Sequence, residues 1–167
     1  MKNLLMSIPD SLIVKRVFTE IQEINEKTLE FGLRLSERDI KVVISNRTEA
    51  LKRTGRVEFG AGVLTKIISS FCDSPYILQD NYVELINDLV ETFYYYKSET
   101  MEEIGDDELI DFMKEYFDNK CQGDLELLKH RYLEQVAHNV KYGERDYFDV
   151  DKGQEDEEED DEQQYYE

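Results

Sequence analysis

Hydrophobic residues recur at spacings of three and four along most of the chain, which is the period of an α-helix with one buried face. In the first such run the apolar positions are Ile13, Val17, Ile21, Ile24 and Phe31. Asp10 or Ser11 is a suitable N-cap, and Gly32 is a suitable residue at which to end the helix. We therefore predict a helix over residues 10–31.

Capping signals mark two more helices before residue 72. Ser36 and Asp39 form a capping-box pattern, with Asp in place of the usual Glu or Gln, and Gly55 follows the last apolar position. These signals predict a helix between residues 36 and 55. Residues 56–59 alternate charged and apolar side chains, which indicates an extended connector or a very short strand. A third helix is predicted from Gly62 to about Phe71.

Three further amphipathic runs fill residues 80–140. The first, from about Asp80 to Glu99, is predicted to be the longest helix. Asp106 or Asp107 is expected to cap the second, which ends near Gly123, and Asp124 to begin the third. With no convincing strand pattern and only two prolines, the sequence predicts an all-α fold, a compact bundle of about five to six helices.

The composition supports one folded domain with an appendage. Hydrophobic residues make up 40% and aromatic residues 11% of the 167 residues, which is enough for a real core. Residues 144–167 carry thirteen acidic side chains against two basic ones, including eight consecutive carboxylates from Glu155 to Glu162. Such dense like charge opposes folding, so we predict a helical domain over 1–143 and a disordered acidic tail over 144–167. The tail residues suited to docking on a partner or on the body are Tyr147, Phe148, Tyr165 and Tyr166.

The net charge of −19 argues against nucleic-acid or anionic-membrane binding as the overall role. No apolar run approaches the roughly 20 residues that span a bilayer, and the first residues do not resemble a secretory signal. Two cysteines cannot form a disulfide framework, so we expect a reducing cytosol. One local exception to the acidic balance is a basic stripe at Arg38, Lys41 and Lys52, which leaves open a contact to nucleic acid or to the acidic tail.

Arg47 is the most informative charged residue, because it falls between Ile44 and Leu51 in the apolar stripe of its helix. A guanidinium there must be paired or must reach outward to solvent. Glu58, just beyond the turn, is a suitable partner, and Arg56 lies beside it. Two interpretations stay open: a structural ion pair, or a polar pocket between helices that binds a small ligand or substrate.

Tyr94, Tyr95 and Tyr96 cover most of the circumference of the helix predicted over residues 80–99. Tyr96 continues the inward stripe, so at least one of Tyr94 and Tyr95 is expected near the surface. Exposed aromatic residues of this kind are enriched among interface anchors. A second contact inside the domain would explain them equally well.

The remaining chemistry-bearing residues do not predict a metal or cofactor site. His130, Glu134 and His138 recur every four residues, but the two histidines are about 12 Å apart along one helix and cannot share an ion. The turn Gly60-Ala61-Gly62 precedes a helix and could accept an anion, yet it lacks the dinucleotide and P-loop patterns. Cys72 has Asp73 beside it, which disfavours a reactive thiolate, so we expect a buried structural cysteine.

Two segments resemble an uncharacterised family of small bacterial helical proteins, known as a domain of unknown function. They are Gly55-Arg56-Val57-Glu58-Phe59-Gly60 and Phe71-Cys72-Asp73-Ser74-Pro75-Tyr76, and residues 93–97 and 106–110 are similar to the family too. The resemblance covers most of residues 1–143. It implies a bacterial cytosolic helical protein and supplies no catalytic residues.

From these features we expect a non-catalytic helical protein–protein interaction module of the bacterial cytosol, with Tyr94 and Tyr95 as the candidate interaction surface. The expected partner is another protein, and self-association is left open. The alternatives are a small-ligand binder or enzyme that uses Arg47, Arg56 and Glu58, and a nucleic-acid contact through the basic second helix. No cofactor and no metal are predicted.

Overall fold

The computed structural model describes residues 4–150, and within this range every regular element is a helix. The predicted all-α fold is therefore confirmed. The elements are α1 (Leu4–Thr28), η1 (Leu29–Phe31), α2 (Glu37–Thr54), α3 (Val63–Phe71), η2 (Gln79–Asn81), α4 (Tyr82–Glu99), α5 (Asp106–Asn119), α6 (Leu125–Leu127), η3 (Leu128–Leu133) and α7 (Glu134–Lys141).

The ends of α2 follow the predicted capping chemistry. The Asp39 N–H donates to the Ser36 hydroxyl at 3.1 Å, and the Ser36 N–H donates to the Asp39 carboxylate at 3.1 Å. The backbone N–H groups of Ser36 and Asp39 therefore both have a hydrogen-bond acceptor, as in a capping box. At the other end Gly55 adopts a φ of 71°, a left-handed conformation that costs glycine little.

Three predictions about helix ends are wrong. The first helix begins at Leu4, so Asp10 and Ser11 lie inside it, and its 25 residues make it longer than the 18 of α4. Polar residues inside a helix cost less than about 1 kcal/mol each, so a good capping residue need not begin one. Gly105, not Asp106 or Asp107, is the N-cap of α5.

The last predicted helix is a single rod with an irregular centre. Asp124 caps it as predicted, since its carboxylate accepts the Leu127 N–H at 3.1 Å. Between α6 and α7, however, the segment η3 is a π-helix with wider turns. The regular spacing assumed from the sequence therefore fails at residues 128–133.

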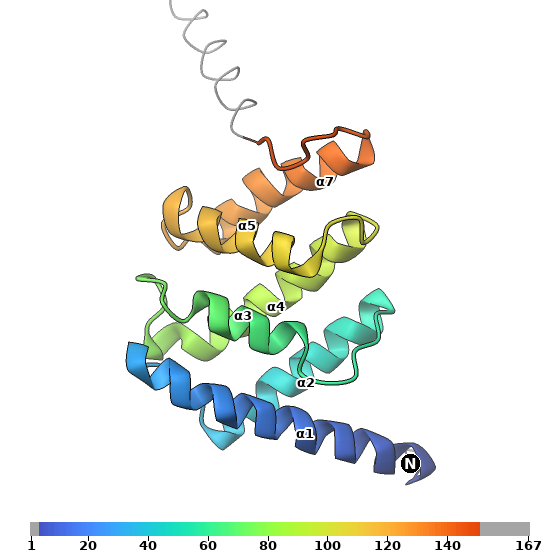
Figure 1. The fold of residues 1–167 in the computed structure, drawn as a ribbon, viewed down its shortest axis with the longest axis vertical. Helices are drawn as coiled ribbons and strands as arrows, with labels where there is room; N and C mark the ends of the chain where they lie inside the picture. Colours follow the sequence, from blue (N-terminus) through green and yellow to red (C-terminus); the bar gives the residue numbers. More distant parts are fainter. Residues whose placement is uncertain (1–3, 151–167) are drawn as a thin grey trace, which may run out of the picture.

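The helices are stacked along the long axis of the molecule, with α1 at one end and α7 at the other (Figure 1). The helix α4 packs against α2, α3 and α5, while η3 packs against α5. The centre holds large aromatic side chains, among them Phe71 and Phe117, whose rings meet edge to face at 5.6 Å. Because α4 packs against three other helices, side chains on its different faces have different neighbours.

The segment 144–150, which we assigned to the tail, packs on the domain. Phe148 stacks on Phe112 with 4.8 Å between ring centroids, and the Asn139 side chain donates to the Tyr147 carbonyl at 3.1 Å. Val150 is 3% exposed. The boundary at residue 143 is therefore too early, because these apolar side chains bury enough surface to hold the chain down. The rest of the predicted tail, with Tyr165 and Tyr166, lies outside the described residues.

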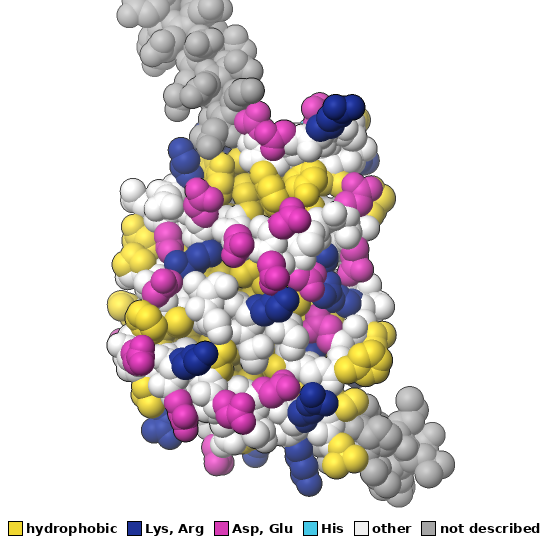
Figure 2. Space-filling view, in the orientation of Figure 1, with side chains coloured by type: hydrophobic (Ala, Val, Ile, Leu, Met, Phe, Trp, Pro, Cys, Tyr) yellow, Lys and Arg dark blue, Asp and Glu magenta, His cyan; other side chains and the backbone are white. Residues whose placement is uncertain are grey.

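Acidic and basic side chains are interspersed over the face shown in Figure 2, and neither sign forms a continuous field there. Hydrophobic side chains gather at the level of α5 and α7 on the same face. No helix within residues 4–150 is long and apolar enough to cross a bilayer.

Candidate functional site

The α2 stripe places Arg47 inside the molecule, where it is 3% exposed. Its Nη2 lies 2.9 Å from Oε1 of Glu58 and also donates to the Gly60 carbonyl. The predicted ion pair is therefore present. Its Nε, by contrast, is one of three buried polar atoms without a hydrogen-bond partner among the described side chains of residues 12–150.

Glu58 comes from the extended connector between α2 and α3, where alternate residues face opposite sides. Arg56 and Glu58 point inward, while Val57 and Phe59 are 74% and 78% exposed. A strand with one buried face usually has the reverse arrangement, with its apolar side chains inside. Here ionic contacts on the inner side hold the connector in place.

The Glu58 carboxylate joins three donors from three elements. Besides Arg47, it pairs with Nε of Arg56 at 2.9 Å and accepts the Tyr94 hydroxyl at 2.8 Å. Gly62 allows this approach, because a Cβ there would lie 2.7 Å from Glu58 Oε1 and the residue has a φ of +50°. The turn that begins α3 is thus shaped around the carboxylate.

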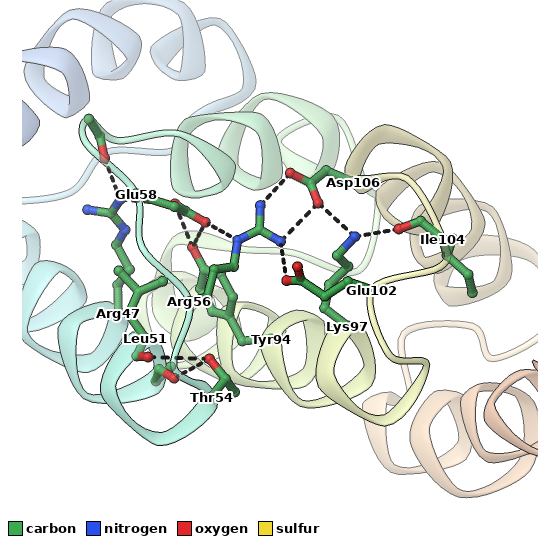
Figure 3. A network of polar contacts seen from close by, with 12 residues as sticks. Arg47, Leu51, Thr54, Arg56, Glu58, Tyr94, Lys97, Glu102, Ile104 and Asp106 are labelled. Carbon is green, nitrogen blue, oxygen red and sulfur yellow. Dashed lines mark hydrogen bonds and ion pairs between the residues drawn. The ribbon is translucent and has the colours of Figure 1, made fainter. Parts of the chain in front are cut away.

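Arg56 extends the cluster to the start of α5 (Figure 3). It binds Asp106 with two nitrogens and lies 3.3 Å from Glu102, while Lys97 lies 3.1 Å from Asp106 and donates to the Ile104 carbonyl. We call this set the ionic network. Its charged members are three cations and three carboxylates: Arg47, Arg56, Lys97, Glu58, Glu102 and Asp106.

Interactions within the ionic network favour the charged forms of Asp106 and Arg56. Burial raises the pKa of Asp106, but hydrogen bonds from Arg56 and Lys97 outweigh it and leave that pKa below 3.8. Burial lowers the pKa of Arg56, but the hydrogen bond and charge of Asp106, with the charges of Glu58 and Glu102, outweigh burial and raise that pKa. Burial, followed by the Glu58 charge, raises the pKa of Tyr94. Since each charge is matched by an opposite one nearby, the network is built for stability of the turn between α2 and α3.

Arg47, Arg56 and Glu58 lie together in the structure, as predicted. Their side chains, however, have little exposure to solvent. The Arg47 and Glu58 side chains are 4% and 9% exposed. A cavity of about 280 Å³ lies beside Arg56, and neither Arg47 nor Glu58 lines it. Sequence reasoning missed Lys97 and Asp106, whose spacing from residue 56 carries no local signal.

Tyr94 and Tyr95, which are adjacent on α4, differ in their exposure to solvent. Tyr94 is 1% exposed, so its assignment to an interaction surface is wrong: its ring is buried and its hydroxyl is bound to Glu58. Tyr95 is 51% exposed. One of the two therefore lies at the surface, as the pattern indicated.

Tyr95 lies in a groove of about 480 Å³, which we call the α4 groove. The helix α4 contributes most of its lining residues, and residues of α2, η3 and α7 line it as well. Its charged lining residues are Arg53, Asp88, Glu91, Glu99, Lys129 and Glu134, together with His130. A cavity of this size is within the range of ligand and peptide sites.

The groove differs from the network in having more carboxylates than cations. Burial and the Glu91 charge raise the pKa of Asp88, and the Glu99 charge is the largest cause that raises the pKa of Tyr95. The Tyr96 hydroxyl donates to Glu134 at 2.7 Å and fixes this carboxylate at the groove wall. The groove lining therefore has an excess of negative charge that Arg53 and Lys129 only partly offset.

The wall of the groove includes the π-helical segment η3, which sequence reasoning missed. Short π-helical turns are rare and occur often at functional sites. The Tyr96 hydroxyl lies 3.1 Å from the Lys129 carbonyl within this segment. We find no residue pattern in the sequence that would have indicated the wider turn.

The other candidate groups have structural partners. Glu126 binds His130 at 2.9 Å, and His138 packs on Tyr142. Among the side chains that the structure describes, those of residues 12–150, no three His, Cys, Asp or Glu residues are placed to hold a metal ion.

The glycine turn and the cysteines likewise show no open binding site. The Ala61 N–H is occupied by the Glu20 carboxylate at 2.7 Å. Cys72 is half-buried, less than predicted, and burial followed by the Asp73 charge raises the pKa of its thiol. Burial also raises the pKa of Cys121, to about 11.

The sequence model of a family of unknown function, DUF6323, matches residues 20–146. The chain belongs to this family. The DUF6323 match covers the end of α1 from residue 20 and all of α2 to α7, so it includes both the ionic network and the α4 groove. No curated protein and no solved structure matches the chain.

Proposed function

We propose that this DUF6323 protein is a non-catalytic helical protein–protein interaction module of the bacterial cytosol, and that its partner binds in the α4 groove. One observation carries the proposal: the half-exposed Tyr95 lines a groove about 480 Å³ in volume. Aromatic residues in such positions often supply much of the binding energy of an interface. The two free cysteines agree with a reducing compartment.

The arrangement of the charged groups favours this function over a ligand pocket at Arg47, Arg56 and Glu58. Those side chains bind one another and the backbone, and Arg47 and Glu58 are nearly inaccessible. A substrate would have to displace contacts that hold the connector in place. The α4 groove is open without any such rearrangement.

A peptide-display experiment tests the proposal. A library of random 12-residue peptides is selected on the full chain, and the enriched peptides are then measured by fluorescence anisotropy. We expect Tyr95→Arg to weaken their binding by about tenfold or more, as for an interface anchor. The matched control is Tyr142→Arg, which changes a tyrosine that is 67% exposed and lies outside the groove lining.

The comparison of the two variants decides the outcome. Binding that survives Tyr95→Arg, or that Tyr142→Arg weakens to the same extent, would show that the groove is not the binding surface. Urea unfolding of both variants establishes that each remains folded. A selection that enriches no peptide sensitive to Tyr95→Arg also overturns the proposal.

A further inference from the structure

We infer that the α4 groove recognises an arginine-bearing segment of another protein, with arginine side chains held by the groove carboxylates and by the ring of Tyr95. This inference rests on the proposed function, because it names the chemistry of the partner that binds the same groove. It follows from three features: an excess of carboxylates over cations in the lining, a half-exposed aromatic ring beside them, and the length of the groove.

The first feature is the charge of the lining. Four carboxylates line the groove, from Asp88, Glu91, Glu99 and Glu134, against two permanent cations. Arg53 lies 3.8 Å from Glu91, and Lys129 lies 3.2 Å from Glu126 beside the groove. Among the side chains of residues 12–150, no ion pair joins Asp88 or Glu99 to a cation, although the Lys129 charge partly offsets the effect of burial on the pKa of Asp88. A positively charged partner would supply counter-charges that these carboxylates do not have within ion-pair distance in the chain.

The second feature is the ring of Tyr95, which lies near one of these free carboxylates. Tyr95 and Glu99 are four residues apart on α4, so they are neighbours on one face of the helix, and the Glu99 charge raises the pKa of the Tyr95 hydroxyl. A guanidinium can stack on an exposed aromatic face and pair with a carboxylate at the same time, because it is planar and carries several donors. An ammonium group presents a point charge and lacks the stacking contact, so the pairing favours arginine over lysine.

The third feature is the extent of the groove along α4. Asp88 and Glu99 are eleven residues apart, which corresponds to about 16 Å along a helix. A single small cation cannot reach both carboxylates. A peptide with arginines about five residues apart in an extended conformation spans that distance, since each residue advances about 3.3 Å.

Part of the groove is already fixed in place. The Tyr96 hydroxyl holds the Glu134 carboxylate at 2.7 Å, and the same hydroxyl lies 3.1 Å from the Lys129 carbonyl of the π-helical wall. A carboxylate held in this way loses little conformational freedom when a cation binds it. The groove can therefore discriminate by geometry as well as by charge.

The test uses four fluorescein-labelled 12-residue peptides of equal length and apolar content, in which the same two positions carry arginine, lysine, glutamine or glutamate. Binding to the full chain is measured by anisotropy at low and at moderate salt. We expect the arginine peptide to bind best and the glutamate peptide worst, with weaker binding at higher salt. The double variant Asp88→Asn/Glu99→Gln should weaken the arginine peptide by about tenfold.

A matched variant separates the groove from the general acidity of the chain. Glu26→Gln/Glu115→Gln removes the same charge from exposed positions on α1 and α5, outside the groove lining. It should change binding by less than about twofold. If it weakens the arginine peptide as much as the groove variant does, the attraction is non-specific and the inference fails.

Two further outcomes distinguish this inference from the proposed function. If the glutamine and arginine peptides bind alike and Tyr95→Arg abolishes both, the groove binds peptides but does not select cations, and only the inference is overturned. If spermine displaces the arginine peptide while binding as tightly, the groove recognises a small polycation and the protein-segment inference is overturned. Arginine-selective binding that requires both Tyr95 and the two carboxylates supports it.

Discussion

Tyr94 and Tyr95 are neighbours in sequence, yet they belong to regions with opposite electrostatic organisation. On an α-helix they point about 100° apart. Tyr94 reaches Glu58 in the ionic network, where three cations face three carboxylates and the central side chains are buried. Tyr95 lies in the α4 groove, where four carboxylates face two permanent cations and the surface is open.

This difference separates a charge that stabilises the fold from one that is available for recognition. A buried charge must find its counter-charge within the molecule, because losing water costs several kcal/mol per ion. An exposed carboxylate keeps its water and can remain without a partner until another molecule supplies one. Breaking the network should therefore affect stability, and changing the groove should affect binding.

The largest expected effect is that of Glu58→Ala, which leaves Arg47 buried without its counter-charge. Removing one partner of a buried ion pair typically costs about 3–5 kcal/mol. We expect a loss of this size in the free energy of unfolding, measured by urea denaturation. Glu26→Ala, at an exposed position of α1, is the control and should change stability by less than about 0.5 kcal/mol.

A double variant tests whether the loss arises from the uncompensated charge. Arg47→Met removes the guanidinium that Glu58→Ala leaves unpaired, so the double variant Arg47→Met/Glu58→Ala should be destabilised by less than the sum of the single ones. Strict additivity would show that the two side chains do not act as a pair. Arg47→Met alone also tests the ligand alternative, since a folded variant that loses no binding excludes a role for this guanidinium in recognition.

The two tyrosines provide the next test, because the same change is made on both faces of α4. Tyr94→Phe removes a hydroxyl that donates to a buried carboxylate and should cost about 1.5–3 kcal/mol of unfolding free energy. Tyr95→Phe removes an exposed hydroxyl and should cost less than about 0.5 kcal/mol. Equal losses in urea denaturation would mean that the two faces are not distinct in the way proposed.

The ionic pair at the centre of the network could be predicted because its signals are local. Arg47 stands out in an apolar stripe, and Glu58 follows eleven residues later beyond a glycine turn. Lys97 and Asp106 could not be predicted, since they join the network only when α4 and α5 fold beside the connector. The three consecutive tyrosines indicated that at least one of Tyr94 and Tyr95 lies near the surface, without naming which one would be buried.

The groove depends still more on tertiary structure. Its lining comes from α2, α4, η3 and α7, and one wall contains a π-helical turn for which the sequence gives no sign. The N-cap of α2 at Ser36 was predicted correctly, because its hydrogen bonds join residues that are close in sequence. The N-cap of α5 was missed, because Asp106 binds Arg56 and Lys97 instead of capping the helix. Local rules fail where a residue has a distant partner.

A pH titration should show the network carboxylate as a source of stability that is lost in acid. The pKa of Asp106 in the folded protein lies below 3.8, so its ionised form favours the fold. This contribution is complete above the unfolded pKa and is lost as the pH falls through the folded pKa. Urea midpoints should therefore decline below about pH 4, and Asp106→Asn should lower stability at pH 7 and flatten the decline. An unchanged acid profile in that variant would contradict the assignment.

The smallest effect is expected at Asp88, where the sign is reversed. Burial, followed by the Glu91 charge, raises its pKa, so its contribution to stability is full below the unfolded pKa and is lost as the pH rises through the folded pKa. Asp88→Asn should therefore raise the free energy of unfolding at pH 7, by no more than about 0.5 kcal/mol because solvent screens the carboxylate. The same change should weaken the arginine peptide. A loss of stability would show that Asp88 has a favourable partner within the fold, and the groove would then lose one of its two free carboxylates.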